Sequence, residues 1–299
     1  MKQKFEFMDF MIYLLCGLFT LLCFYPIYNT FINTISDNRL VTAGRVMWYP
    51  LGLHFKNFQQ FFRLTGLIRA TMVSVARTAL GTLLSVFTVS FMAYAITRPE
   101  YWLRKVWYRF IIATMYLSAG LIPGYLLMYN LRLTNNFLVY IIGGLAPAPF
   151  YLVLVKTFIE SIPFSMDESA EIDGAGYIRR YFQVNMPLCK PILATIIVFT
   201  AVGQWNAVMD TVIYMSNDKW YTLQIVLYKF MIEADRLANT MRQLGTTGGA
   251  MSEEMLRTKI SPAGVRYTAT VVIITPILLV YPFMQRYFVK GIMIGAIKG

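Results

Sequence analysis

The chain has 299 residues and a formal net charge of +12, with 57% hydrophobic and 14% charged residues. The apolar residues gather into runs of about 20, the length that crosses a bilayer, whereas a soluble chain of this size would bury one mixed core. The composition therefore indicates a polytopic membrane protein and excludes an ordinary soluble domain.

Six apolar runs predict six transmembrane helices in an all-α fold. They cover residues 10–35, 68–97, 106–130, 137–159, 192–215 and 263–288. Lys2 and Lys4 precede the first run as in a signal peptide, but the run is too long and lacks the small residues of a processing site, so we expect a retained helix. Without an internal repeat or a soluble segment, residues 1–299 are expected to form a single transmembrane domain.

The distribution of basic residues predicts the orientation in the membrane. The short connection after the second run is rich in them, with Arg98, Arg104, Lys105 and Arg109. The connection after the third run carries only Arg132. Basic residues close to span ends favour the cytoplasm. We therefore expect both termini inside and the loops 36–67 and 216–262 outside. The aromatic residues lie inside the apolar runs, which favours a membrane over nucleic acid as the partner.

Motifs for catalysis and metal binding are not found in the sequence. It has no phosphate-binding GxxxxGK[ST], no HExxH and no GxSxG pattern. The three cysteines lack ligand spacing, and the sole histidine, His54, has no carboxylate beside it. We expect no catalytic residue, no metal and no cofactor in this chain, so that any ATP would be bound by another chain.

A charged segment interrupted by glycine, residues 166–191, separates the fourth and fifth runs. Four carboxylates precede Gly174: Asp167, Glu168, Glu171 and Asp173. Arg179 and Arg180 follow, before Pro187 and Pro191. Acidic residues suit the first turn of a helix, and small residues allow a partner close to the backbone. The segment is interpreted as a docking element outside the lipid, with a solvated amphipathic linker as the alternative.

The spacing of this segment is similar to the E-A-A, x3, G, x9, I-x-L-P signature of ABC importer permease subunits. It reads Glu168-Ser169-Ala170, three residues, Gly174, nine residues, Val184-Asn185-Met186-Pro187, with conservative departures at Ser169, Val184 and Met186. In that family the segment forms a short coupling helix that fits a cleft in the ATPase subunit. The resemblance implies that ATPase coupling involves Glu168, Ser169, Ala170, Asp173, Gly174, Ala175 and Pro187.

Further stretches resemble the maltose-type G-subunit group of carbohydrate permeases, and in particular its LplC-like polysaccharide branch. They are Gly203-Gln204-Trp205-Asn206 with Asp210, residues 221–227, the tail from Tyr281, and, more loosely, Asn57-Phe58 and Ala93-Tyr94-Ala95 with Arg98. In that family the tail, here residues 289–299, enters the interface of the ATPase dimer. The resemblance assigns this contact to Gly295, Lys298 and Gly299; a frayed terminus is the alternative.

Polar residues in the fifth run identify a candidate substrate pathway. Gln204, Trp205 and Asn206 should face protein or water, because unpaired polar groups in hydrocarbon cost several kcal/mol. Sugars are recognised by hydrogen-bonding groups and aromatic faces, so these residues are expected to line the route with tyrosines of the third run: Tyr116, Tyr125 and Tyr129. Helix-to-helix hydrogen bonding is the alternative.

The resemblance implies a type I ABC importer permease in the bacterial cytoplasmic (inner) membrane. The implied partners are a homologous second permease, two cytoplasmic ATPase subunits that bind ATP and Mg, and an extracytoplasmic binding protein that delivers an oligosaccharide. The amphipathic stretch 223–237 either receives that protein or rests on the membrane interface.

Outward basic residues would tolerate an acidic, uronate-bearing sugar: Arg39, Arg45, Arg63 and Arg132.

Two other classes of protein remain open. A stand-alone ion-coupled transporter usually carries ionisable residues near the middle of its spans or has two related halves with broken helices, whereas the expected spans here hold Arg77 and a border-placed Asp210 but no carboxylate pair. A membrane enzyme needs a nucleophile, base or metal cluster, and the sequence offers none.

Overall fold

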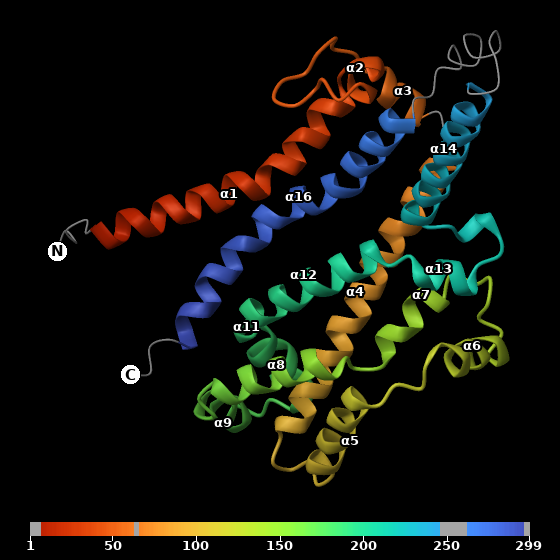
Figure 1. The fold of residues 1–299 in the computed structure, drawn as a ribbon. Coiled ribbons are helices and arrows are strands. Elements are labelled where there is room, and N and C mark those ends of the chain that lie inside the picture. Colours follow the sequence, from red (N-terminus) through yellow and green to blue (C-terminus); the bar gives the residue numbers. More distant parts are fainter. Residues whose placement is uncertain (1–6, 63–65, 246–261, 296–299) are drawn as a thin grey trace. The chain divides into compact units, whose positions relative to one another are not determined.

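The computed structural model describes residues 7–62, 66–245 and 262–295, and within these residues the chain forms helices and no strand (Figure 1). The expectation of an all-α chain is confirmed over this part. The chain divides into two compact units: unit 1 holds residues 1–67 and 227–276, and unit 2 holds residues 68–226 and 277–299. The single domain over residues 1–299 stays a prediction.

Unit 1 consists of α1 (Phe7–Thr34), α2 (Asn38–Thr42), α3 (Lys56–Phe62), most of α14 (Leu223–Gly245) and the first part of α16 (Pro262–Gly295). Most of α1 is exposed and apolar, as expected of a helix that faces lipid, and it is buried only at Ile32, Asn33 and Thr34. There Ile32 packs with Val41 and Val46 in a small core. The connection after the first span is therefore folded against the end of α1.

A pair of asparagine side chains holds this connection together. Asn38 Nδ2 donates to Asn57 Oδ1 at 2.9 Å, and Asn57 Nδ2 donates to Asn38 Oδ1 at 3.1 Å and to the Thr34 carbonyl at 2.9 Å. A Cβ atom on Gly264 would lie 2.6 Å from Asn38 Oδ1 and 2.8 Å from Asn57 Oδ1. Only glycine allows α16 to start this close to the pair.

Unit 2 is built around α4 (Leu67–Thr97). Its other elements include α5 (Arg104–Tyr116), α6 (Leu121–Asn130), α7 (Val139–Ile142), η1 (Gly143–Leu145), α8 (Pro149–Ser161), α12 (Lys190–Asn206), α13 (Met209–Tyr214) and η3 (Asp218–Trp220). One core joins α4, α5, α8 and α12, and its most buried side chains are Val89, Leu152, Val155, Tyr181 and Ile196. The ribbon shows α12, α8 and α5 spaced along α4 (Figure 1).

The described residues contain two continuous helices long and apolar enough to cross a membrane, α1 and α4. In three further cases, two neighbouring helices are long and apolar enough only when they are taken together as one bent pair. If each bent pair is one span, the described residues contain up to five spans. The bend is 119° between α5 and α6, 41° between residues 139–145 and α8, and 81° between residues 177–188 and α12. The total of six spans stays a prediction.

The third and fifth expected spans are not single helices. Leu117 is extended after α5, Gly120 has φ +84°, and α6 then begins afresh. A positive φ favours glycine, and Pro123 is tolerated in the first turn of α6 because no helical partner is lost there. In the fifth span α12 ends at Asn206, and the chain is extended at Ala207 before α13.

Candidate functional site

The segment between α8 and α12 forms short helices joined by a tight turn. These are α9 (Ser165–Ile172), α10 (Tyr177–Arg180), the π-helical turn η2 (Tyr181–Asn185) and α11 (Met186–Leu188). The turn closes α9 with two hydrogen bonds, from Gly174 N to the Glu171 carbonyl and from Ala175 N to the Ala170 carbonyl, each 2.9 Å long. Gly174 has φ +79°, the conformation this helix ending requires. The glycine of the signature is thus explained by backbone geometry.

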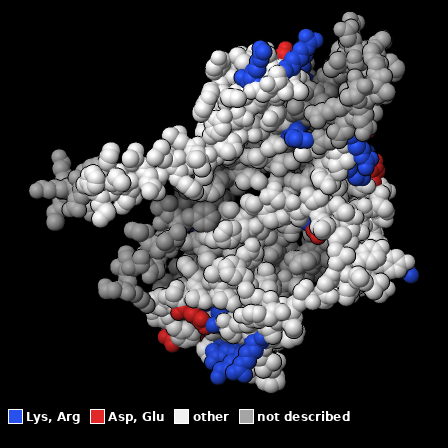
Figure 2. Space-filling model, in the orientation of Figure 1, with Lys and Arg blue, Asp and Glu red and all other residues white. Residues whose placement is uncertain are grey.

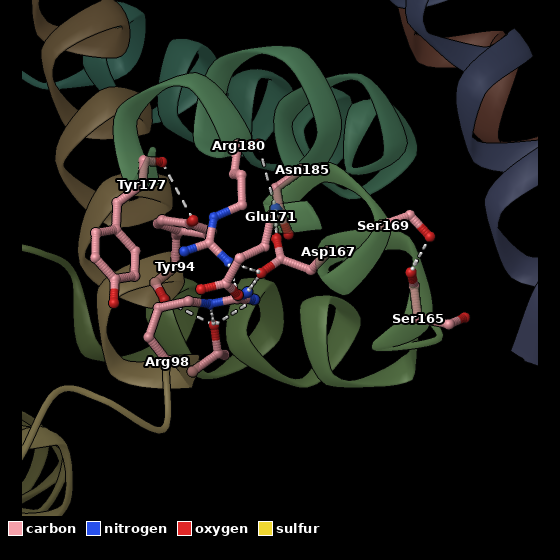
Figure 3. A network of polar contacts seen from close by, with 10 residues as sticks. Tyr94, Arg98, Ser165, Asp167, Ser169, Glu171, Tyr177, Arg180 and Asn185 are labelled. Atoms are coloured by element: carbon pink, nitrogen blue, oxygen red, sulfur yellow. Dashed lines mark hydrogen bonds and ion pairs between the residues drawn. The ribbon is translucent and has the colours of Figure 1, made fainter. Parts of the chain in front are cut away.

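A buried carboxylate, Asp167, lies at the centre of the segment (Figure 3). It is 5% exposed and pairs with Arg98, the residue that follows α4. It also accepts from Arg180 Nη1 and from Asn185 Nδ2, each at 3.1 Å. Arg180 Nη1 donates further to Glu171 at 2.7 Å. Two arginines and two carboxylates thus form one neutral cluster, which we call the Asp167 cluster.

The helix ends explain why these charges occupy these positions. Arg98 lies at the C-terminal end of α4, where a helix dipole favours a cation, and Asp167 lies in the first turn of α9, where it favours an anion. Burial by itself lowers the pKa of Arg180, but Asp167 and Glu171 outweigh that effect and raise the pKa. Arg180 therefore stays charged. Because the ion pairs of Asp167 with Arg98 and Arg180 are buried, loss of one partner lowers the free energy of unfolding by about 3–5 kcal/mol.

Two tyrosines extend the contact between α4 and the segment. The Arg98 guanidinium lies 4.5 Å from the Tyr94 ring centroid, and that of Arg180 lies 4.6 Å from the Tyr177 ring centroid. Tyr94 Oη donates to the Tyr177 carbonyl at 3.2 Å. Such cation–π contacts stabilise by about 0.5–2 kcal/mol each. Each arginine is therefore held by a tyrosine ring as well as by its ion pairs.

The predicted coupling residues lie on the surface around this cluster. Glu168, Ser169, Asp173, Gly174 and Pro187 are exposed, and Ala170 and Ala175 are half-buried. Two isoleucines beside them are unusually open, with 87% exposure for Ile172 and 60% for Ile178. In Figure 2 acidic side chains gather over α9 and basic ones over the connection from α4 to α5. The segment thus presents small, acidic and apolar groups together, as a docking surface requires.

The signature identified the exposed residues of the segment but not Asp167, the residue that joins the segment to the end of α4. Asp167 and Glu171 are four residues apart, so the sequence indicated that both lie on one face of a helix, but not that this face meets Arg180. The pairing of Asp167 with Arg98, across 69 positions, gave no local signal.

A second polar cluster involves the residues predicted to line the substrate pathway. Arg77 in α4 is 2% exposed. Its Nε donates to Gln204 Oε1 at 3.0 Å, its Nη1 donates to the Ala207 carbonyl at 3.2 Å, and its Nη2 pairs with Asp210. The Tyr140 ring centroid lies 4.5 Å from the guanidinium. Arg77 thus takes up the carbonyl that the break after α12 would otherwise leave without a helical partner.

The predicted pathway residues occupy different environments. Gln204 packs between helices, where a Cβ on Gly81 would lie 2.9 Å from its Nε2, and Trp205 is 7% exposed. Asn206 is exposed. These contacts fit the helix-packing alternative for Gln204 and Trp205, and the pathway stays a prediction.

The predicted tyrosines are divided by the bend in the third span. Tyr116 is 82% exposed at the end of α5, whereas Tyr125 and Tyr129 lie on α6. Tyr125 stacks with Tyr129 and with Tyr214 of α13, each at 6.2 Å between ring centroids. The structure thus adds Tyr214 to this group.

The tail is helical as far as the structure describes it. Gly291 and Gly295 belong to α16, and the contact of the tail with an ATPase pair stays a prediction. Residues 290–295 contain no proline, so no backbone N–H is lost from the helix there. Lys298 and Gly299 lie outside the described residues.

Within the described part of the chain, no group of three or more His, Cys, Asp and Glu side chains could hold a metal ion.

Comparison with known proteins identifies the class. Residues 85–294 match the family described as binding-protein-dependent transport system inner membrane component, and the chain belongs to this family. It is therefore a multi-pass membrane permease and not an enzyme, and the resemblance to ABC importer permeases is confirmed.

Several relatives are named as permeases for carbohydrates. The chain is 29% identical over 298 residues to the polygalacturonan/rhamnogalacturonan transport system permease protein YtcP of Bacillus subtilis (strain 168), covering 99% of this chain and 100% of that protein. Protein LplC of the same organism is 31% identical over 251 residues, covering 84% and 81%. A solved bacterial ABC transporter involved in the import of the acidic polysaccharide alginate contains a chain with TM-score 0.81 and 28% identity, covering 96% of this chain and 99% of that one.

Proposed function

We propose that this chain is one of two homologous permease subunits of an ATP-driven importer that takes up acidic, uronate-bearing oligosaccharides. The names of the relatives support this substrate class, since polygalacturonan and alginate are both acidic polymers. Arg39, Arg45 and Arg132 are exposed in the connections expected to face outward. Basic side chains there would attract an anionic sugar and its carrier.

The proposed assembly contains two cytoplasmic ATPase subunits, which bind ATP and Mg, and an extracytoplasmic solute-binding protein. This chain binds no cofactor, and both of its termini lie in the cytoplasm of a bacterial cell. Closure of the ATPase pair moves the docked segment, and the spans alternate between inward-open and outward-open states. Under this proposal Gly295, Lys298 and Gly299 contact the ATPase pair, and Gln204, Trp205, Asn206, Tyr116, Tyr125 and Tyr129 line the sugar route.

One observation carries the proposal: the signature residues are exposed around the charge-neutral Asp167 cluster, in which Asp167, Arg98 and Arg180 are buried. A solvated linker needs no such cluster, because surface ion pairs alone satisfy its charges. A segment that must transmit force needs its outer surface free and its inner side fixed. The segment from α9 to α11 meets both conditions.

Substitution of Gly174 tests this role. A Cβ on Gly174 meets nothing within 4 Å, so Gly174→Leu is accommodated by the chain itself at a backbone cost of about 1 kcal/mol. In the docked state the side chain would hold the partner away from the backbone. We expect insertion to be preserved and sugar uptake per ATP hydrolysed to fall at least tenfold in proteoliposomes.

Gly143→Ala is the matched control, because Gly143 also has open space around it but lies at φ −58°. Co-purification completes the test. An ATPase chain that remains bound through detergent extraction supports the importer, whereas uptake by the solitary chain driven by a proton gradient would identify a secondary transporter instead.

A further inference from the structure

The coupling segment contacts α4 through one stripe of that helix. Ser90, Tyr94 and Arg98 follow each other at intervals of four residues and so lie on the same face. Ser90 Oγ is 2.8 Å from Tyr181 Oη, Tyr94 Oη donates to the Tyr177 carbonyl at 3.2 Å, and Arg98 pairs with Asp167. The stripe therefore meets η2, α10 and α9 in turn.

These contacts reach a span that the backbone of the segment does not reach. Covalently, the segment continues from α8 and into α12. Its link to α4 is non-covalent, and it is buried: Ser90 is 2% exposed, Tyr94 4%, Arg98 7% and Tyr181 1%. The stripe therefore gives the segment a direct contact with α4, in addition to the core that α4 shares with α8 and α12.

Asp167 is the part of the link with the most restricted geometry. Its Oδ2 faces Arg98 and Arg180 while its Oδ1 accepts from Asn185, so donors from three positions fix one carboxylate (Figure 3). An asparagine at this position would turn an N–H₂ group toward one of these donors and leave the two buried arginines with a single carboxylate, that of Glu171. Buried, closely packed groups joined by several hydrogen bonds resist displacement relative to one another.

We propose that Asp167 is a positioning residue that makes the coupling segment and the end of α4 move as one body, with Ser90, Tyr94 and Arg98 as the points of attachment. The inference rests on the proposed function and extends it. ATPase motion reaches the second span directly through this contact, in addition to the fourth and fifth spans that continue the backbone.

Asp167→Asn in the complete importer tests the proposal. Proteoliposomes containing both permeases and both ATPases receive the binding protein, a uronate oligosaccharide and ATP, and uptake and phosphate release are measured together. Because Asp167 lies beneath the docking surface, the ATPases should remain bound and hydrolyse ATP, while uptake per ATP falls at least tenfold. Glu100→Gln is the matched control, with the same charge change at an exposed residue two positions after Arg98, and should keep the wild-type ratio.

Tyr94→Phe provides a second variant that keeps the fold. It removes only the hydroxyl that reaches the Tyr177 carbonyl and keeps the ring beside Arg98, so the complex should assemble fully while uptake per ATP falls about twofold to fivefold. If Asp167→Asn fails to assemble, the result with Tyr94→Phe decides. A wild-type ratio of uptake to ATP hydrolysis in an assembled Asp167→Asn complex overturns the inference. If Asp167→Asn does not assemble, the same wild-type ratio in the Tyr94→Phe complex overturns it.

The wild-type sample separates this outcome from failure of the proposed function. Uptake by wild type that does not depend on ATP, or a wild-type chain that retains no ATPase, refutes the importer itself. ATP-driven wild-type uptake together with unaffected variants refutes only the attachment of the segment to α4.

Discussion

At the scale of single residues, two buried arginines have different tasks: Arg77 lies within α4 and Arg98 directly follows it. Arg98 fixes the coupling segment through Asp167, and Arg77 fixes the break between α12 and α13. An uncompensated charge within a span costs several kcal/mol, so each arginine requires its carboxylate. The sequence showed Arg77 and Asp210 as ionisable residues in apolar runs, but their pairing across 133 positions became visible only in the structure.

We expect Asp210→Asn to destabilise the protein because it leaves Arg77, with a side chain 2% exposed, without its counter-charge. The Asp210 side chain is itself 43% exposed, so solvent screening reduces the loss to about 1–3 kcal/mol. Thermal unfolding in detergent measures the effect. The double variant Arg77→Gln/Asp210→Asn should recover part of it, which appears as a coupling energy in a double-mutant cycle.

Glu160→Gln is the matched control for this cycle. It makes the same carboxylate-to-amide change in the pair of Lys156 and Glu160, which lies on the surface of α8 with Glu160 50% exposed. Its effect should stay below about 1 kcal/mol. Equal losses for Asp210→Asn and Glu160→Gln, with no coupling to Arg77, would contradict the role assigned to the buried pair.

At the scale of elements, length and apolarity predicted α1, α4 and α16 well, because a long apolar run has few other ways to satisfy its backbone. The signature implied a short coupling helix between the fourth and fifth spans. The structure places α9 and its turn at Gly174 there, and the coupling role stays a prediction. The breaks were harder. Gly120 and the prolines at 147 and 149 are recognisable breakers. In contrast, α12 ends at Asn206 without one, and the carbonyl of the next residue, Ala207, accepts a hydrogen bond from Arg77 of α4.

The start of α16 provides a test at this scale. Gly264→Ala would place a Cβ 2.6 Å from Asn38 Oδ1, so either the asparagine pair or the helix must shift. We expect a loss of about 1–3 kcal/mol in stability, the usual cost of overpacking. Gly17→Ala in α1 meets nothing within 4 Å and should be neutral. Equal melting temperatures for the two variants would show that the asparagine pair does not restrict the position of α16.

At the scale of the whole molecule, composition and the signature were enough to predict a helical permease, because both are properties of the sequence as a whole. The attachment of the coupling segment to α4 was not predictable, since it depends on contacts between residues about 70 to 90 positions apart. The central claim is that this surface lies on the cytoplasmic side and docks on an ATPase. Such a claim is testable by the chemical accessibility of one exposed residue.

Ile172, 87% exposed beside Gly174, is suitable for this purpose. In an Ile172→Cys chain with Cys16 and Cys23 replaced by serine, Cys189 can remain. It is 2% exposed, and burial raises the pKa of its thiol to about 11, so it stays protonated and unreactive near neutral pH.

The decisive measurement is labelling of Ile172→Cys by a membrane-impermeant maleimide in sealed vesicles of known orientation. We predict labelling only where the cytoplasmic face is accessible, and protection when the ATPase subunits are assembled on the permease. Labelling from the extracytoplasmic face, or equal labelling with and without the ATPases, would contradict the account.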